Sequence, residues 1–130
     1  MGDFNAKIGK LNTNLANNTR IGPHALDELN EKGNRLIGTA CELKVANTYF
    51  KKKPKRKWTW ISPNGSTKTE IDHALTNDIS IIKDISPLSL SAFGFPSDHK
   101  IVKCKVRINT RVIYNNNRKK NEKLKRIFPL

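Results

Sequence analysis

Three short polar strings hold the side chains best suited to chemistry: Gly-Asp-Phe-Asn at 2–5, Ile-Asp-His at 71–73 and Ser-Asp-His at 97–99. Each contains an Asp, two add a His and one adds an Asn. Carboxylate, imidazole and amide groups together can bind a divalent metal and activate water against a phosphodiester. Asp3 and Asn5 would project to the same side at a strand end. An isolated Asp-Phe-Asn is also typical of a turn capped by its own side chains.

The residues around these strings follow a recognisable order: Gly-Asp-Phe-Asn-Ala-Lys-Ile-Gly at 2–9, Asn-Glu-Lys-Gly-Asn-Arg-Leu at 30–36, Val-Ala-Asn-Thr-Tyr-Phe at 45–50 and Trp-Thr-Trp at 58–60. In this order they resemble the C-terminal half of the endonuclease/exonuclease/phosphatase superfamily, over residues 2–108. The resemblance is closest to the endonuclease domains of RTE/BovB-like LINE (non-LTR) retrotransposons. Each motif match is a hypothesis whose structural context must agree.

The resemblance implies a role for each polar residue of the strings. Asp3 would orient or deprotonate the attacking water, and Asn5 would hydrogen-bond the phosphate or that water. Asp72 would hold His99 in the tautomer and charge state that stabilise a phosphorane-like transition state. Asp98 would lie near the metal or the leaving group. The cofactor implied for the complete domain is Mg²⁺ or Mn²⁺.

The resemblance also implies an incomplete domain. A full domain of this family has a further half before these motifs, and that half supplies an Asn and a metal-binding Glu. The expected fold is α/β, half of a four-layer DNase I-like sandwich, with a mostly antiparallel sheet and one helical layer. We therefore expect a fragment of a DNA endonuclease that nicks a target strand in retrotransposition. Metal binding would be weak or absent in this fragment, and activity would be low without the first half.

Two alternative functions remain. One is a non-catalytic, basic remnant that binds nucleic acid. The other is a phosphatase of inositol phosphates or phospholipids, which the retrotransposon-like segments and the basic tail disfavour. The expected partners are DNA and either the missing first half or a reverse transcriptase domain of a parent polyprotein. No membrane partner and an intracellular location are expected, because no apolar run approaches transmembrane length and no signal segment is evident. Within the cell, a nuclear location is expected.

Positive charge is the strongest feature of the composition. The net charge is +14, and residues 100–130 hold eleven Lys or Arg against one Glu. Such density favours a polyanionic partner, since phosphate contacts release counterions. For the basic run at 51–57 taken alone, a solvated face or a localisation signal is the alternative interpretation. The predicted nucleic-acid-binding residues are Lys51, Lys52, Lys53, Lys55, Arg56 and Lys57, followed by Arg118, Lys119, Lys120, Lys123, Lys125 and Arg126.

Short elements must position these residues within a domain at 1–109, which a basic tail or linker at 110–130 follows. Apolar spacing favours a helix, β-branched and aromatic runs favour strands, and Pro-Asn-Gly-Ser favours a turn. Strict alternation in the last strand predicts one buried and one wet face. The elements predicted are a helix at 28–43, a strand at 45–50, a hairpin with arms at 57–62 and 68–76 around a turn at 63–66, and strands at 79–89 and 100–108.

Several conspicuous side chains are given structural interpretations. His73 is assigned to strand packing and left out of the catalytic set. Trp58 and Trp60 could stack on bases, but alternation places both rings on one face, where core burial is the commoner fate. Cys41 and Cys104 lie in no zinc spacing and are expected to be reduced thiols, with Cys104 a small buried apolar residue.

Overall fold

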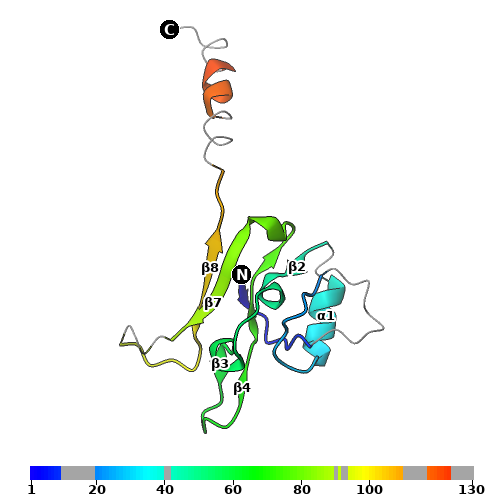
Figure 1. The fold of residues 1–130 in the computed structure, drawn as a ribbon, viewed down its shortest axis with the longest axis vertical. Helices are drawn as coiled ribbons and strands as arrows, with labels where there is room; N and C mark the ends of the chain where they lie inside the picture. The colour runs from blue at the N-terminus through cyan, green and yellow to red at the C-terminus, as the bar shows by residue number, and fades with distance from the viewer. Residues whose placement is uncertain (10–19, 40–41, 90, 92–93, 110–116, 124–130) are drawn as a thin grey trace.

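A computed structural model describes residues 1–9, 20–39, 42–89, 91, 94–109 and 117–123. In this part of the chain, short antiparallel strand pairs form a body that includes helix α1, and a second helix lies in the tail (Figure 1). The mixed α/β class that the sequence predicts is therefore confirmed. The described strands form four separate two-stranded sheets.

The longest ladder joins β7 (Ile82–Leu88) to β8 (Ile101–Val106), which run side by side in Figure 1. Both predicted strands are confirmed, although Ile79–Ile81 forms a 3-10 turn before β7. Pro87 does not end its strand, because it lies opposite Val102 within the ladder. It donates no backbone hydrogen bond, which a strand edge tolerates.

The apolar face of β8 is only half-buried, contrary to the prediction. Val102 and Cys104 pack against a small cluster formed by Ala46, Ala74 and Ile85. Further along, 47% of the surface of Val106 and 67% of that of Ile108 are exposed. The physical reason is that the ladder extends beyond the elements that cover it. Cys104 is a free, half-buried thiol, and Cys41 lies outside the described residues.

The predicted hairpin is confirmed as β3 (Trp60–Ile61) and β4 (Lys68–Thr69). Its turn includes Gly65 at φ +72°, a conformation that glycine adopts without strain. The predicted second arm does not continue as one strand. It breaks into β4, β5 (Asp72–His73) and β6 (Leu75–Thr76), and each segment pairs with a different partner.

These pairings bring distant segments together. The first strand, β1 (Gly2–Asp3), pairs with β5. A second short strand, β2 (Lys44–Val45), pairs with β6. Residues 68–76 therefore form the central segment to which the N-terminus and the middle of the chain attach.

Two predicted elements are shorter than expected. Helix α1 spans Glu31–Thr39 instead of 28–43, because the Asn30 side chain accepts a hydrogen bond from Gly33 N at 2.7 Å and so caps the helix there. The strand predicted at 45–50 ends at Val45 and is wrong beyond it. Residues Ala46–Tyr49 form a 3-10 turn, in which the Thr48 hydroxyl donates to Val45 O at 2.6 Å.

The interior contains much polar material. One apolar cluster is formed by Ile8, Ile21, Ala25 and Val45. The other, formed by Ala46, Ala74 and Ile85, is smaller. The buried polar and charged residues are Asn47, Thr48, Lys57, Thr59, Thr69, Glu70, His73 and Thr76.

Lys57 illustrates how this polar interior is satisfied. Its ammonium donates to Asn47 O at 2.7 Å and lies 3.5 Å from a carboxylate oxygen of Glu70. Burial lowers the pKa of Lys57 and raises the pKa of Glu70. Lys57 is only 4% exposed, so its predicted contact with nucleic acid is wrong, because a buried and paired ammonium cannot reach a phosphate.

The two Trp side chains are half-buried, not core residues, and the residue buried between them is Thr59. The pattern failed here because the polar Thr59 has backbone partners inside the fold. In the tail, residues 117–123 are helical and exposed, and this helix stands beyond the end of β8 in Figure 1. Among the described helices, none is long and apolar enough to cross a membrane.

Candidate functional site

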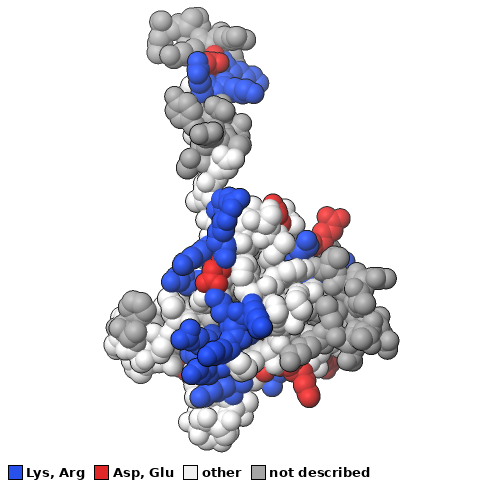
Figure 2. Space-filling model, in the orientation of Figure 1, with Lys and Arg blue, Asp and Glu red and all other residues white. Residues whose placement is uncertain are grey.

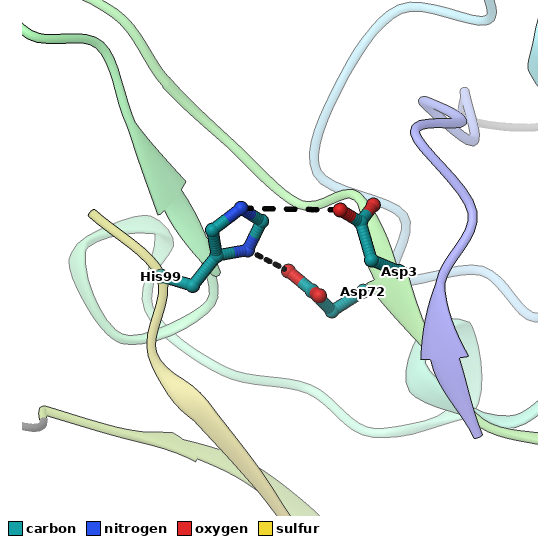
Figure 3. Close-up of side chains that lie close together, drawn as sticks. All are labelled: Asp3, Asp72 and His99. Carbon is teal, nitrogen blue, oxygen red and sulfur yellow. Dashed lines mark hydrogen bonds and ion pairs between the residues drawn. The ribbon is translucent and has the colours of Figure 1, made fainter. Parts of the chain in front are cut away.

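The side chains of Asp3, Asp72 and His99 come together from three parts of the chain (Figure 3). The ring nitrogen Nδ1 of His99 lies 3.0 Å from Asp72 Oδ2, and Nε2 lies 3.9 Å from Asp3 Oδ2. The predicted hydrogen bond between Asp72 and His99 is therefore confirmed. Both nitrogens of the imidazole face a carboxylate, so the ring links the two acids.

Strand pairing sets the position of each acid. Asp3 lies directly opposite Asp72 in the β1–β5 pair. Two like charges at such a position repel each other, and the His99 ring relieves this when it carries a proton. The backbone of His99 pairs with that of Trp60, the first residue of β3, in an isolated antiparallel bridge, and this pairing holds His99 in place.

Two buried side chains fix the backbone at Asp72. The Thr59 hydroxyl accepts hydrogen bonds from the amides of Ile71 at 3.0 Å and Asp72 at 3.1 Å. The Asn47 amide group donates to Asp72 O at 3.0 Å. Thr59 and Asn47 are positioning residues that sequence reasoning missed, because a Thr or Asn inside a strand or turn carries no distinctive signal.

Asn5 adopts the turn geometry that was the alternative interpretation of Asp-Phe-Asn. Its φ is +49°, a left-handed conformation that Asn tolerates better than most residues. Its backbone N–H donates to Asp3 Oδ1 at 2.8 Å. The extended arrangement expected for Asp3 and Asn5 is therefore replaced by a tight turn, which still places both residues on one cavity.

That cavity has a volume of about 250 Å³. It contains three of the four predicted catalytic residues, while Asp72 lies behind His99 as its hydrogen-bond acceptor. The lining residues are Asp3, Asn5, Lys7, Asn30, Trp60, Thr69, Ile71 and His99. Lys7, Asn30 and Thr69 were not predicted, although Lys7 and Asn30 lie within the family-like strings at 2–9 and 30–36.

Asp98, which is predicted to lie near the metal or the leaving group, is outside the group of described side chains that could share an ion. Asp98 is exposed, and its Oδ2 accepts a hydrogen bond from the Trp60 indole at 3.0 Å. In the described part of the chain, the side chains that could share an ion are Asp3, Asp72 and His99, whose ligand atoms lie within 4.8 Å of one another. Two carboxylates and an imidazole are a donor set that several divalent metals accept, and Mg²⁺ would need further oxygen ligands.

The predicted nucleic-acid-binding residues fall into distinct environments. Lys52 is half-buried and forms an ion pair with Asp84. Most of the others are exposed, and Figure 2 shows Lys and Arg gathered in a band over the body and on the tail helix. The exposed ones are Lys51, Lys53, Lys55, Arg56, Arg118, Lys119, Lys120 and Lys123, whereas Lys125 and Arg126 lie outside the described residues.

Comparison with curated proteins finds similarity to craniofacial development protein 2. The chain is 31% identical over 115 residues to the protein of Tragulus javanicus and 30% identical over 115 residues to that of Bos taurus. Each match covers 87% of this chain but 19% of the relative, so the chain spans about a fifth of the length of these relatives. No family model matches the chain, and no solved structure matches it.

Proposed function

We propose that this chain is the C-terminal half of a divalent-metal-dependent DNA endonuclease domain, similar to those of RTE/BovB-like retrotransposons. The observation that carries the proposal is the Asp3–His99–Asp72 arrangement beside a cavity. Motifs that are far apart in the sequence meet at one site, as phosphodiester hydrolysis requires. The finer fold, half of a four-layer sandwich, is part of the same proposal.

The geometry gives each side chain a task. Asp72 accepts the Nδ1 proton of His99, which fixes the ring and leaves Nε2 facing Asp3 across 3.9 Å. A phosphate oxygen near Nε2 would receive a proton or a hydrogen bond from the ring. Asp3 is 49% exposed at its side chain and is placed to orient or deprotonate a water. A bound divalent cation would supply charge neutralisation and a more acidic water.

The same geometry argues that the site needs more ligands. Mg²⁺ takes near-octahedral oxygen coordination, and the cluster offers two carboxylates, one of which is already bonded to His99. We therefore expect the chain alone to nick supercoiled plasmid at or near background with Mg²⁺. Joined to a first half of the same family, it should cleave.

The test uses that joined protein. His99→Ala and Asp3→Asn should abolish Mg²⁺-dependent nicking, whereas His24→Ala, a matched loss of another histidine, should retain it. A joined protein that is folded yet inert would remove the endonuclease proposal. Robust nicking by the chain alone that both substitutions abolish would show that the site is complete without the first half.

A non-catalytic nucleic-acid-binding protein is the second candidate. The exposed basic side chains of the body and of the tail helix favour it (Figure 2). DNA binding measured by anisotropy separates the candidates when it is combined with the nicking assay. For a protein that only binds DNA, His99→Ala would leave DNA binding unchanged, and the nicking assay would show no cleavage with or without the substitution.

A further inference from the structure

A second concave site lies apart from the Asp3–His99 cavity. Its volume is about 320 Å³, and the two cavities share no lining residue. Two of its residues belong to a 3-10 turn at Pro54–Arg56, and two belong to β7. We call it the basic cavity, and it is lined by Lys52, Lys55, Arg56, Ser86, Pro87 and Lys100.

The charges around the basic cavity are unbalanced. Four of its six lining residues are cations, and the one acid that pairs with them is Asp84, which contacts Lys52. Among the described residues, Lys55, Arg56 and Lys100 form no ion pair. Cations held together without counter-charges create a positive potential that favours an anion.

Lys100 lies close to an aromatic ring and to a second ammonium outside the cavity. Its ammonium lies 3.3 Å from the centre of the Trp58 ring, and a second ammonium, from Lys68, lies 5.3 Å from the same ring. Burial, followed by the neighbouring charge of Lys68, lowers the pKa of Lys100. An anion in the cavity would offset both effects.

The basic side chains stand on a backbone that is held in place. The turn is closed by hydrogen bonds from Arg56 N to Lys53 O at 2.8 Å and from Lys57 N to Pro54 O at 3.0 Å. The next side chain, Lys57, is anchored in the interior. Lys100 N donates to Thr59 O at 2.7 Å. A preorganised site loses less conformational entropy when it binds a ligand.

We infer that the basic cavity binds a phosphate of a nucleic-acid strand. His99 and Lys100 are sequence neighbours that line one cavity each. Because successive side chains of an extended segment point to opposite faces, a strand that contacts both would have to pass around the edge between them. The link to a second phosphate at His99 rests on the proposed endonuclease function. The anion site itself rests on the charges and shape of the cavity.

The test compares two double variants in DNA binding. Lys55→Ala/Arg56→Ala removes two cavity cations, and Lys51→Ala/Lys53→Ala removes two exposed cations of the same run that do not line the cavity. With a fluorescent duplex, the first should weaken binding by about tenfold or more and reduce the salt slope of log K by about 0.9, the value for one lost phosphate contact. The second should do much less, and equal losses would overturn the inference.

A further variant tests the charge balance in the opposite direction. Asp84→Asn removes the carboxylate that pairs with Lys52 and should tighten DNA binding severalfold, while unchanged or weaker binding by the folded variant would count against the cavity. Free phosphate, followed by NMR shifts of the cavity amides, should bind more weakly than the duplex. Should the Lys55/Arg56 loss occur with phosphatidylserine vesicles and not with DNA, the site is a lipid site and the inference is wrong.

These outcomes are independent of catalysis. If the joined protein fails to cleave while the two double variants still differ in DNA binding, the endonuclease proposal falls and the anion site stands. If His99-dependent cleavage is found but the two double variants bind DNA alike, the endonuclease proposal stands and the anion site is wrong.

Discussion

At the scale of single residues, His73 is a fully buried titratable group with one unpaired ring nitrogen. Its side chain is fully buried, and Nε2 lies 2.7 Å from Ala6 O, so Nε2 must carry the proton and donate it. The other nitrogen, Nδ1, is buried without a partner among the described atoms. Protonating Nδ1 would place an unpaired charge in the core, and burial accordingly lowers the pKa of His73.

This gives stability a defined pH dependence. The unfolded chain takes up a proton near the ordinary pKa of 6.5, whereas the folded chain resists it. Unfolding below this pH is therefore accompanied by uptake of a proton. The contribution of neutral His73 to the free energy of unfolding should be complete above pH 6.5 and should decrease as the pH falls below it, by up to about 1.4 kcal/mol per pH unit. Urea unfolding between neutral and mildly acidic pH measures this. His73→Phe should flatten the slope, and a slope that is the same in both proteins would contradict the assignment.

At the scale of elements, α1 is fixed by how closely it approaches the irregular segment after the first motif. Asn30 both caps the helix and accepts a hydrogen bond from Lys7 N at 3.1 Å. A Cβ atom added to Gly33 would lie 2.0 Å from Lys7 O, which leaves room only for glycine. The helix thus holds Lys7, a residue that lines the candidate site.

The two glycines of α1 make a matched pair for testing this contact. Gly38→Ala meets nothing within 4 Å and should stabilise the protein by about 0.5–1 kcal/mol, because Ala favours the helix. Gly33→Ala makes the same chemical change but should destabilise by about 1–3 kcal/mol through overpacking. Thermal unfolding of both variants is the measurement. Similar shifts in Tm would show that α1 does not pack on Lys7.

At the scale of the whole molecule, charge is divided between the body and the tail helix. Residues 117–123 are exposed throughout, and their described ion pair, Arg118–Glu122, lies within the helix itself. Nothing in the described structure ties this helix to the core, so its lysines are available to phosphates.

Replacing Lys119, Lys120, Lys123 and Lys125 by Ala should therefore weaken binding to every DNA sequence alike. Phosphate contacts carry no sequence information, and the salt dependence of binding should decrease as contacts are lost. Anisotropy titrations on unrelated duplexes at several salt concentrations measure this. The midpoint of urea unfolding should stay unchanged, and selective loss for one sequence would indicate base contacts instead.

Sequence alone determined the local features of this protein. The hairpin around Pro-Asn-Gly-Ser, the strands that became β7 and β8, and the α/β class were predicted because turn chemistry and alternation are local properties. The motif strings predicted the contact between Asp72 and His99, although only through resemblance to a family.

Tertiary structure decided the rest, because burial and pairing depend on partners far along the chain. The basic run predicts an exposed Lys57, yet this side chain is buried, where it pairs with Glu70 and donates to Asn47 O. The sequence predicts one strand at 68–76, yet this segment forms three short strands because each part pairs with a different partner. A local pattern states what a residue can do, and its partners decide whether that residue faces water, core or ligand.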